Sequence, residues 1–309
     1  MSPVSSPKYL IIIAGPTAVG KTAVAIEVAK YFHTDIVSAD SRQLFKELSI
    51  GVARPSEAEL AEVKHHFIAN KSIDEYISAG EYQREVMDLL HELYATKDVV
   101  VLCGGTGFYI NALLYGLDKI PDIDPAVRAL LNRECELHGL VPLQQRLKEL
   151  DETTYHSIDV QNTQRVIRAL EVCIGTGMPF SAFKTRQAVS PLEAAGIIPV
   201  KIALNMPKEQ LHQRINERVD AMMEAGFPEE AKSVHAYKSH NALQTVGYKE
   251  LFDFLEGKCT LEEAVSLIKL HTRQYAKRQL TFFNKNDDYH WFHPSEIPQL
   301  LQFLKETIR

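Results

Sequence analysis

Short apolar runs alternate with amphipathic segments along the first third of the chain. Residues 8–14 (KYLIIIA), 35–39 (DIVSA) and 98–103 (DVVVLC) are short runs of largely apolar residues, as is typical of strands. Residues 21–31 and 80–96 have apolar side chains at helical spacing. This alternation of strand and helix predicts an α/β fold with a parallel sheet, and the run 98–103, which is apolar after Asp98, is expected inside that sheet.

The pattern becomes helical after residue 117. Between 118 and 195 there is almost no strand signal, and helices are marked by Asp124-Pro125, Pro142 and Asn162–Ile174. Residues 199–204 (PVKIAL) again predict a strand, followed by a long helix. We therefore predict an α/β core of residues 1–117 and 199–309, with C-terminal helices, and an all-helical insertion domain of residues 118–198.

The composition is that of a folded protein without repeats. Of 309 residues, 45% are hydrophobic and 24% are charged, which excludes disordered, collagen-like and coiled-coil proteins. Cys103, Cys135, Cys173 and Cys259 form no C-x-x-C pair, which argues against a disulfide framework and a zinc site. The longest apolar run, residues 9–15, is too short for a membrane span or a signal peptide, so we expect a cytoplasmic protein without a membrane partner.

The charge distribution leaves room for a local polyanion site. A net charge of −6 disfavours nucleic-acid binding through bulk positive charge. Residues 264–286, however, hold five cations and no Asp or Glu: Lys269, Arg273, Lys277, Arg278 and Lys285. This stretch is either a nucleic-acid contact or a basic surface helix.

A phosphate-binding motif follows the first predicted strand. Residues 15–22 (GPTAVGKT) fit G-x-x-x-x-G-K-[ST] between a strand and a helix, which is the context that the motif requires. Its members are Gly15, Pro16, Thr17, Ala18, Val19, Gly20, Lys21 and Thr22. Backbone N–H groups at a helix N-terminus bind phosphate oxygens, the lysine neutralises phosphate charge, and the Thr22 hydroxyl is expected to complete a Mg²⁺ shell. The motif predicts that a di- or triphosphate binds.

The chemistry carried out on that phosphate is indicated by the ends of the other strands. A nucleotide hydrolase usually has a Walker B aspartate at the end of a later strand, but the strand over 98–103 leads into Gly104-Gly105-Thr106. Asp40 and Ser41 follow the second strand, and in such folds ligands bind at the carboxyl ends of strands, so these residues and Thr106 are expected to share a crevice with Lys21. From the residues alone, Asp40 is a metal ligand, a general base or a helix N-cap.

Nine sequence blocks resemble one enzyme family along nearly the whole chain. The blocks are GPTAVGKT (15–22), SADSRQ (38–43), IGVARPS (50–56), HHF (65–67), GGTGFYINALLYG (104–116), QNTQRVIRALE (161–171), LHQRINERV (211–219), VGYKE (246–250) and TRQYAKRQLTFF (272–283). In this order they resemble the bacterial tRNA dimethylallyltransferases, also called tRNA isopentenyltransferases. One departure is that the family's usual Thr-Ala-Lys-Pro is Val52-Ala53-Arg54-Pro55 here, which keeps a cation and loses a hydroxyl.

The resemblance implies a P-loop NTPase-like parallel sheet core and a prenyl-transfer reaction. A dimethylallyl group would pass from dimethylallyl diphosphate to N6 of adenosine 37, in tRNAs that read codons beginning with U. The P-loop would then hold the prenyl diphosphate rather than ATP, with Mg²⁺ as the cofactor. Asp40 would accept the N6 proton beside Thr106, and Arg214 of a later helix would contact the diphosphate.

The same resemblance implies a set of tRNA contacts by an enzyme expected to act as a monomer. The target base must leave the anticodon stack to react. Contacts to the anticodon stem-loop would come from Asp40, Ser41, Arg42, Gln43, Thr106, Arg128, Gln164, Arg165, Val166, Ile167, Arg168, Gln244, Gly247, Tyr248, Lys249, Arg273, Lys277 and Arg278.

Two other functions are compatible with the motifs. One is a P-loop kinase of a small metabolite or nucleoside, with ATP as donor and Asp40 as base; it leaves the basic segment unexplained. The other is a non-catalytic, nucleotide-controlled RNA-binding module in which Asp40 only caps a helix.

Overall fold

The computed structural model describes residues 6–184, 189–285 and 288–308. It contains two compact units: residues 1–114 together with 190–309, and residues 115–189. The strands are β1 Lys8–Ala14, β2 Ile36–Ser38, β3 His65–His66, β4 Val99–Gly104, β5 Ile197–Leu204 and β6 His290–Phe292. Within the described ranges, no helix is both long and apolar enough to cross a membrane.

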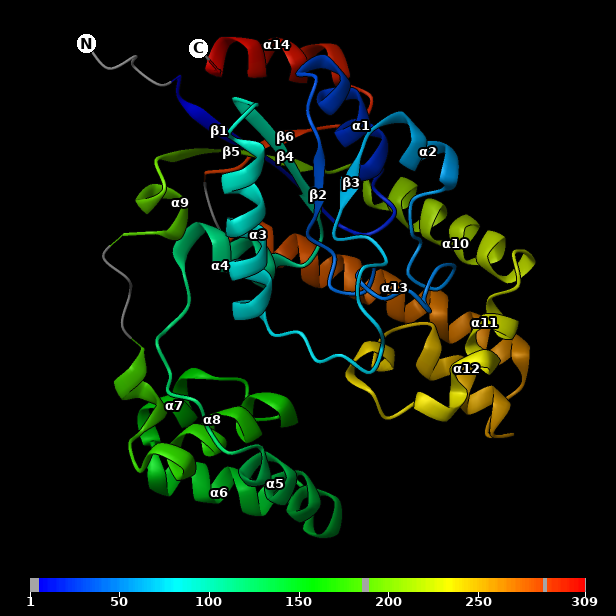
Figure 1. Cartoon of the computed structure of the whole chain (residues 1–309). Helices are drawn as coiled ribbons and strands as arrows, with labels where there is room; N and C mark the ends of the chain where they lie inside the picture. Colours follow the sequence, from blue (N-terminus) through cyan, green and yellow to red (C-terminus); the bar gives the residue numbers. More distant parts are fainter. Residues whose placement is uncertain (1–5, 185–188, 286–287, 309) are drawn as a thin grey trace. The chain divides into compact units, whose positions relative to one another are not determined.

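The helices follow the strands in alternation and then take over the chain (Figure 1). They are α1 Lys21–Tyr31, α2 Glu57–Glu62, α3 Ala79–Leu93, α4 Gly107–Tyr115, α5 Pro125–His138, α6 Val141–Leu150, α7 Glu152–Ser157, α8 Thr163–Thr176, α9 Pro191–Ala194, α10 Lys208–Glu224, α11 Phe227–Ser233, α12 Tyr248–Leu255, α13 Leu261–Phe283 and α14 Ile297–Thr307. Short 3₁₀ helices lie at Phe180–Phe183, His235–Tyr237 and Asn241–Leu243.

The first unit is built on one six-stranded sheet with the order β3-β2-β4-β1-β5-β6, in which every pair is parallel. Ile11 and Ile13 pack in one cluster with apolar residues of α1 and α14, and Leu10 and Ile12, which point to the opposite face, are equally buried. Because both faces are covered, β1 is apolar after Lys8, and β4 contains no charged residue. The predicted fold class, a P-loop NTPase-like parallel sheet core, is confirmed.

Strand β5 begins earlier than the residues 199–204 predicted from sequence. It pairs with β1 from Ile197 onward, so that Pro199 lies inside the strand opposite Leu10. Proline has no N–H to donate, yet β6 covers only Ile202–Leu204 of β5, so at Pro199 the strand has β1 as its one neighbour. The chain therefore rejoins the sheet before residue 199, and α9 also belongs to the first unit.

The second unit is all-helical. Its core is formed by apolar residues of α5, α6 and α8, such as Leu131, Leu143 and Leu170. Its helix starts follow the sequence signals: Asp124 caps α5, and Asn162 accepts a hydrogen bond from a backbone N–H of α8. This unit lies between α4 and α9 in the chain.

Candidate active site

The predicted phosphate loop connects β1 to the N-terminus of α1. Gly20 is the residue before α1 and has φ +103°, a left-handed conformation that favours glycine. Ala18 has φ +64°, so two residues with left-handed backbone bend the loop around the start of the helix. The first N–H groups of α1 have no partner within the helix. Together with the loop they form the kind of helix N-terminus that suits a phosphate anion.

Lys21 is folded back over this loop. Its ammonium donates hydrogen bonds to the carbonyls of Gly15 (3.0 Å) and Pro16 (2.8 Å). Burial lowers its pKa from 10.5 to about 8; the nearby Cys103 and Asp40 oppose this shift, and the charge of Arg218 adds to it. The ammonium is thus a poorly solvated cation that gains from a phosphate anion.

Two arginines of α10 approach the phosphate loop. Arg214 donates from Nε to the Ala18 carbonyl (3.0 Å), and an Arg218 guanidinium nitrogen lies 3.5 Å from the Thr17 hydroxyl. The sequence analysis selected Arg214 alone. The structure brings both arginines to the loop. The charge of Arg218 also contributes to the lowered pKa of Lys21.

The ends of β2 and β4 meet beside the phosphate loop. Gly104 is packed so closely that a Cβ atom there would lie 2.2 Å from the Ala39 carbonyl oxygen. The Thr106 N–H donates to the same carbonyl (3.1 Å), and the Thr106 hydroxyl accepts from the Ser41 N–H (3.0 Å). Asp40 and Thr106 are therefore neighbours, as predicted. The end of β4, where a Walker B aspartate would stand, has Gly104, Gly105 and Thr106 instead of a carboxylate.

The Asp40 carboxylate caps a turn. Its Oδ1 accepts the N–H groups of Arg42 (2.9 Å) and Gln43 (3.4 Å), whereas no hydrogen bond to Oδ2 is found in the part of the chain that the structure describes. The segment that follows is a turn, so Asp40 does not cap a helix as one alternative had it. It orders this turn through Oδ1, and Oδ2 accepts none of these turn hydrogen bonds. Its negative charge opposes the lowering of the Lys21 pKa by burial.

The predicted tRNA-contact segment Ser41–Gln43 is also held from below. Arg42 donates to the carbonyl of Asn241 (2.7 Å) and to its side chain (3.1 Å). Gln43 donates to the carbonyl of Ala53 (3.0 Å) and receives a hydrogen bond from the Ser38 hydroxyl (3.3 Å). These side chains therefore fix the turn around Asp40.

In the predicted contact segment Gln244–Lys249, only part of the chain is exposed. Gln244 and Lys249 are exposed, but Gly247 and Tyr248 are buried. The Tyr248 side chain is fully enclosed and its hydroxyl donates to Glu230 (2.5 Å), so in this structure the side chain is not presented to solvent, and the predicted tRNA contact of Tyr248 stays a prediction.

Glu230 explains why Tyr248 is placed there. Its carboxylate also accepts the N–H groups of residues 49–51, at 2.8 to 3.0 Å. Since Gln43 is bound to the carbonyls of Val52 and Ala53, this carboxylate supports the loop on which the Asp40 turn rests.

The predicted contacts of the second unit divide in the same way. Val166 and Ile167 are buried in its core, so their side chains are not presented to solvent, and their predicted tRNA contact stays a prediction. Helical spacing turns these two positions inward and leaves Gln164 and Arg165 exposed.

Arg128 and Arg168 converge on one buried carboxylate. Arg128 reaches Glu171 through Nε (3.1 Å) and a terminal nitrogen (2.8 Å), and Arg168 reaches the same oxygen at 2.9 Å. Burial alone would raise the pKa of Glu171, but the hydrogen bonds and charges of the two arginines outweigh burial and lower it. Both guanidinium groups thus have an intramolecular role besides any contact with tRNA.

Helix α13 presents the basic segment. Arg273 donates to the Asn216 side chain of α10 (2.7 Å). Lys277 and Arg278 are exposed, and the Arg278 guanidinium lies 5.7 Å from the centre of the Tyr275 ring. The inward face of this helix contains a residue that sequence reasoning missed, the buried Gln279, which contacts the phosphate loop.

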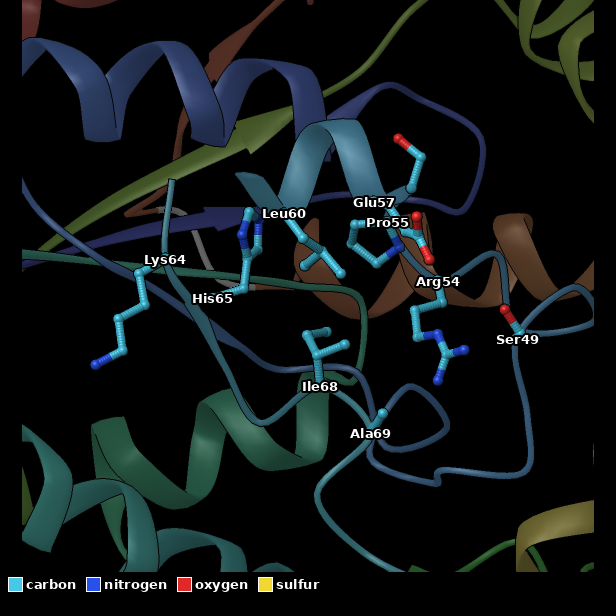
Figure 2. A pocket seen from close by; sticks show the side chains of 10 residues that line it. Ser49, Arg54, Pro55, Glu57, Leu60, Lys64, His65, Ile68 and Ala69 are labelled. Carbon is cyan, nitrogen blue, oxygen red and sulfur yellow. The ribbon is translucent and has the colours of Figure 1, made fainter. Parts of the chain in front are cut away.

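A cavity of about 620 Å³ lies at the β3 edge of the sheet, next to α2 (Figure 2). Arg54, Lys64 and His65 line it, and Arg54 also donates to the Lys46 carbonyl (3.4 Å). In Figure 2 the Lys64 ammonium points away from the Arg54 guanidinium, so these cations do not converge on one ligand. Arg54, the departure from the family pattern, thus lies in the wall of this cavity.

Comparison with known proteins agrees with this site. A sequence model of the family described as IPP transferase matches residues 43–286. The chain is 47% identical to the tRNA dimethylallyltransferase of Cytophaga hutchinsonii, over 98% of either chain, and 44% identical to that of Flavobacterium johnsoniae, over 98% of this chain and 99% of the relative. Among solved structures, the full-length tRNA isopentenylpyrophosphate transferase of Bacillus halodurans is similar at 33% identity, with a TM-score of 0.70 over 97% of both chains. Because the family match spans most of the chain and these relatives align along nearly their whole length, the protein belongs to the IPP transferase family.

Proposed function

We propose that this protein transfers a dimethylallyl group from dimethylallyl diphosphate to N6 of adenosine 37 in tRNAs that read codons beginning with U. The observation that carries the proposal is the shared site of Lys21 and Asp40, with Thr106 beside them. It combines a phosphate loop with a carboxylate that has one oxygen available as a proton acceptor. The names of its relatives support the same reaction.

The phosphate loop serves the leaving group in this proposal. As the C1–O bond of the donor breaks, negative charge builds on the departing diphosphate. The N–H groups at the start of α1, Lys21, Arg214 and Arg218 supply positive charge there. Low solvation of Lys21 strengthens its attraction for that anion.

A divalent metal ion fits the same loop, and we propose Mg²⁺. The Thr22 hydroxyl lies in the first turn of α1, where such a motif presents its Mg²⁺ ligand, and it has no hydrogen-bond partner among the residues that the structure describes. Mg²⁺ usually takes one or two protein oxygens, substrate phosphate oxygens and waters, so a cage of carboxylates is not required. When bound, the ion would neutralise diphosphate charge.

Asp40 serves the acceptor. The N6 amine of adenine is a weak nucleophile because its lone pair is delocalised into the ring. As N6 attacks C1 and the C–N bond forms, the N6 proton passes to Asp40, and diphosphate leaves with the electrons of the C1–O bond. The turn amides of Arg42 and Gln43 fix the carboxylate for this step.

Exposed cations on both units are proposed to hold the anticodon stem-loop. Arg165, Lys249, Lys277 and Arg278 are exposed and suit phosphate contacts. The charge is local, which is how a chain with a net charge of −6 can bind a polyanion.

One assay tests the proposal against the two alternatives. The protein is incubated with unmodified tRNA, labelled dimethylallyl diphosphate and Mg²⁺, and separately with ATP. Label transferred to adenosine 37 supports the proposal. Phosphate transfer from ATP would indicate a kinase, and neither reaction would indicate a binding module.

A further inference from the structure

Gln279 connects the two loops of the site. Its Oε1 accepts the backbone N–H of Thr17 in the phosphate loop (2.9 Å), and its Nε2 donates to the carbonyl of Gly105 (2.9 Å). Gly105 directly precedes Thr106, which holds the turn of Asp40 through Ser41. One side-chain amide thus bridges the donor side and the acceptor side.

A neutral side-chain amide satisfies both partners, whereas an ionised carboxylate cannot. The N–H of Thr17 can only donate and the carbonyl of Gly105 can only accept, so the bridging group needs an acceptor and a donor a fixed distance apart. Gln279 is 7% exposed, and water therefore does not easily replace either bond. Removing the amide leaves the buried carbonyl of Gly105 and the part-buried N–H of Thr17 without this partner, which is costly.

The helix that holds Gln279 is itself anchored and faces solvent on its other side. Arg273 ties α13 to Asn216 of α10, the helix of the two site arginines. Lys277 and Arg278, the two residues that precede Gln279 in the sequence, are exposed and are proposed to contact tRNA. The bridge is therefore placed between the RNA-facing surface of α13 and the phosphate loop.

We propose that Gln279 is a positioning residue that sets the separation between the phosphate loop and the Gly105–Thr106 turn. It thereby sets the separation between the diphosphate donor and Asp40, the proton acceptor. This inference rests on the proposed function. The amide touches neither substrate in this arrangement, because both of its polar atoms are used within the protein.

A bridging role predicts a specific division of effects. Loss of the amide leaves the ligands of each substrate in place, so each binary affinity changes little. The reaction needs both substrates at the correct separation, and an error of about 1 Å can reduce a rate on the order of 100-fold. We expect Gln279→Ala to lower the single-turnover rate by about 10–100-fold, with dissociation constants for donor and tRNA within about threefold of wild type.

The test compares Gln279→Ala, Gln279→Glu and the control Gln274→Ala, which removes an exposed glutamine of the same helix. The glutamate keeps the acceptor for Thr17 and, when ionised, lacks the donor for Gly105, so a reduced rate is expected. Its rate relative to wild type should recover as the pH falls, because a protonated carboxyl group can donate again. The control should match wild type.

The outcomes separate this inference from the proposed function. If wild-type protein and Gln274→Ala transfer label to tRNA while both Gln279 variants lose rate and keep binding, the bridge is supported. Wild-type rates in the Gln279 variants would overturn it, as would equal losses of donor affinity, tRNA affinity and rate, which would mean that the amide only stabilises the fold. Failure of wild-type protein to transfer label would overturn the proposed function instead.

Discussion

The buried lysine of the phosphate loop makes donor binding dependent on pH. Lys21 has a pKa of about 8 in the protein alone, because burial disfavours its charged form. A bound diphosphate places negative charge next to the ammonium and raises this pKa again. Donor binding therefore takes up a proton once the pH exceeds about 8, and affinity must fall as the pH rises.

The size of the effect follows from the pKa. At pH 7 about nine tenths of the Lys21 side chains are protonated, and at pH 9 about one tenth are. If only the protonated form binds well, the dissociation constant of dimethylallyl diphosphate rises about tenfold between these pH values, or about 1.4 kcal/mol. With the ordinary lysine value of 10.5, the change over the same range would be negligible.

Calorimetric titration with dimethylallyl diphosphate and Mg²⁺, without tRNA, measures this dependence. Lys21→Arg is the matched control, since a guanidinium stays charged throughout and experiences the same ionisation of the donor. We expect a tenfold weakening in wild type and a much flatter profile in the variant. Parallel profiles in the two proteins would refute the argument that Lys21 titrates in the site.

Four substitutions test the other assignments. Tyr248→Phe should cost about 1 kcal/mol of stability in thermal unfolding and leave the tRNA affinity unchanged in binding titrations; a weaker tRNA affinity in a folded variant would support Tyr248 as an RNA contact. Glu171→Gln should destabilise the helical unit by about 2–3 kcal/mol in thermal unfolding, since two half-exposed arginines lose their shared carboxylate, whereas Glu136→Gln on exposed α5 surface should not. Arg165→Ala should reduce the salt slope of tRNA binding by about one, and an unchanged slope would make it an ordinary surface residue. Asp40→Asn should lower single-turnover transfer by about 10²–10⁴-fold while both substrates still bind.

Local sequence signals predicted the central elements well. Strand β1 and helix α1 coincide with their predicted ranges, because a buried parallel strand needs an unbroken apolar run and the P-loop marks the helix start. The edge strands β3 and β6 were not predicted, since two or three residues show no period of their own and are held only by their neighbours.

The site contacts that sequence reasoning missed are those whose partners lie far away in the chain. Gln279 and Thr17 are 262 residues apart, and no local pattern announces their contact. The family resemblance assigned Tyr248 to tRNA contact. In the structure its hydroxyl donates to Glu230, and this carboxylate also accepts the N–H of Ser49 in the loop that supports the Asp40 turn. The sequence offers one indirect signal: Gln279 is a polar residue at the helical spacing of the buried positions Ala276 and Phe283. A polar residue on a buried face needs a hydrogen-bond partner.

The geometry of Asp40 makes Asp40→Asn a sharper test than the sequence alone allowed. The backbone N–H groups of Arg42 and Gln43 use Oδ1, which an asparagine also has, so the variant can keep the turn. The change falls on the second position, where an amide nitrogen replaces Oδ2 and cannot accept a proton. A lower rate at saturating tRNA and donor, with unchanged binding, would therefore report proton acceptance rather than loss of the cap. A rate within a few-fold of wild type would assign Asp40 to the turn alone, and weaker tRNA binding at a normal rate would assign it to holding the base.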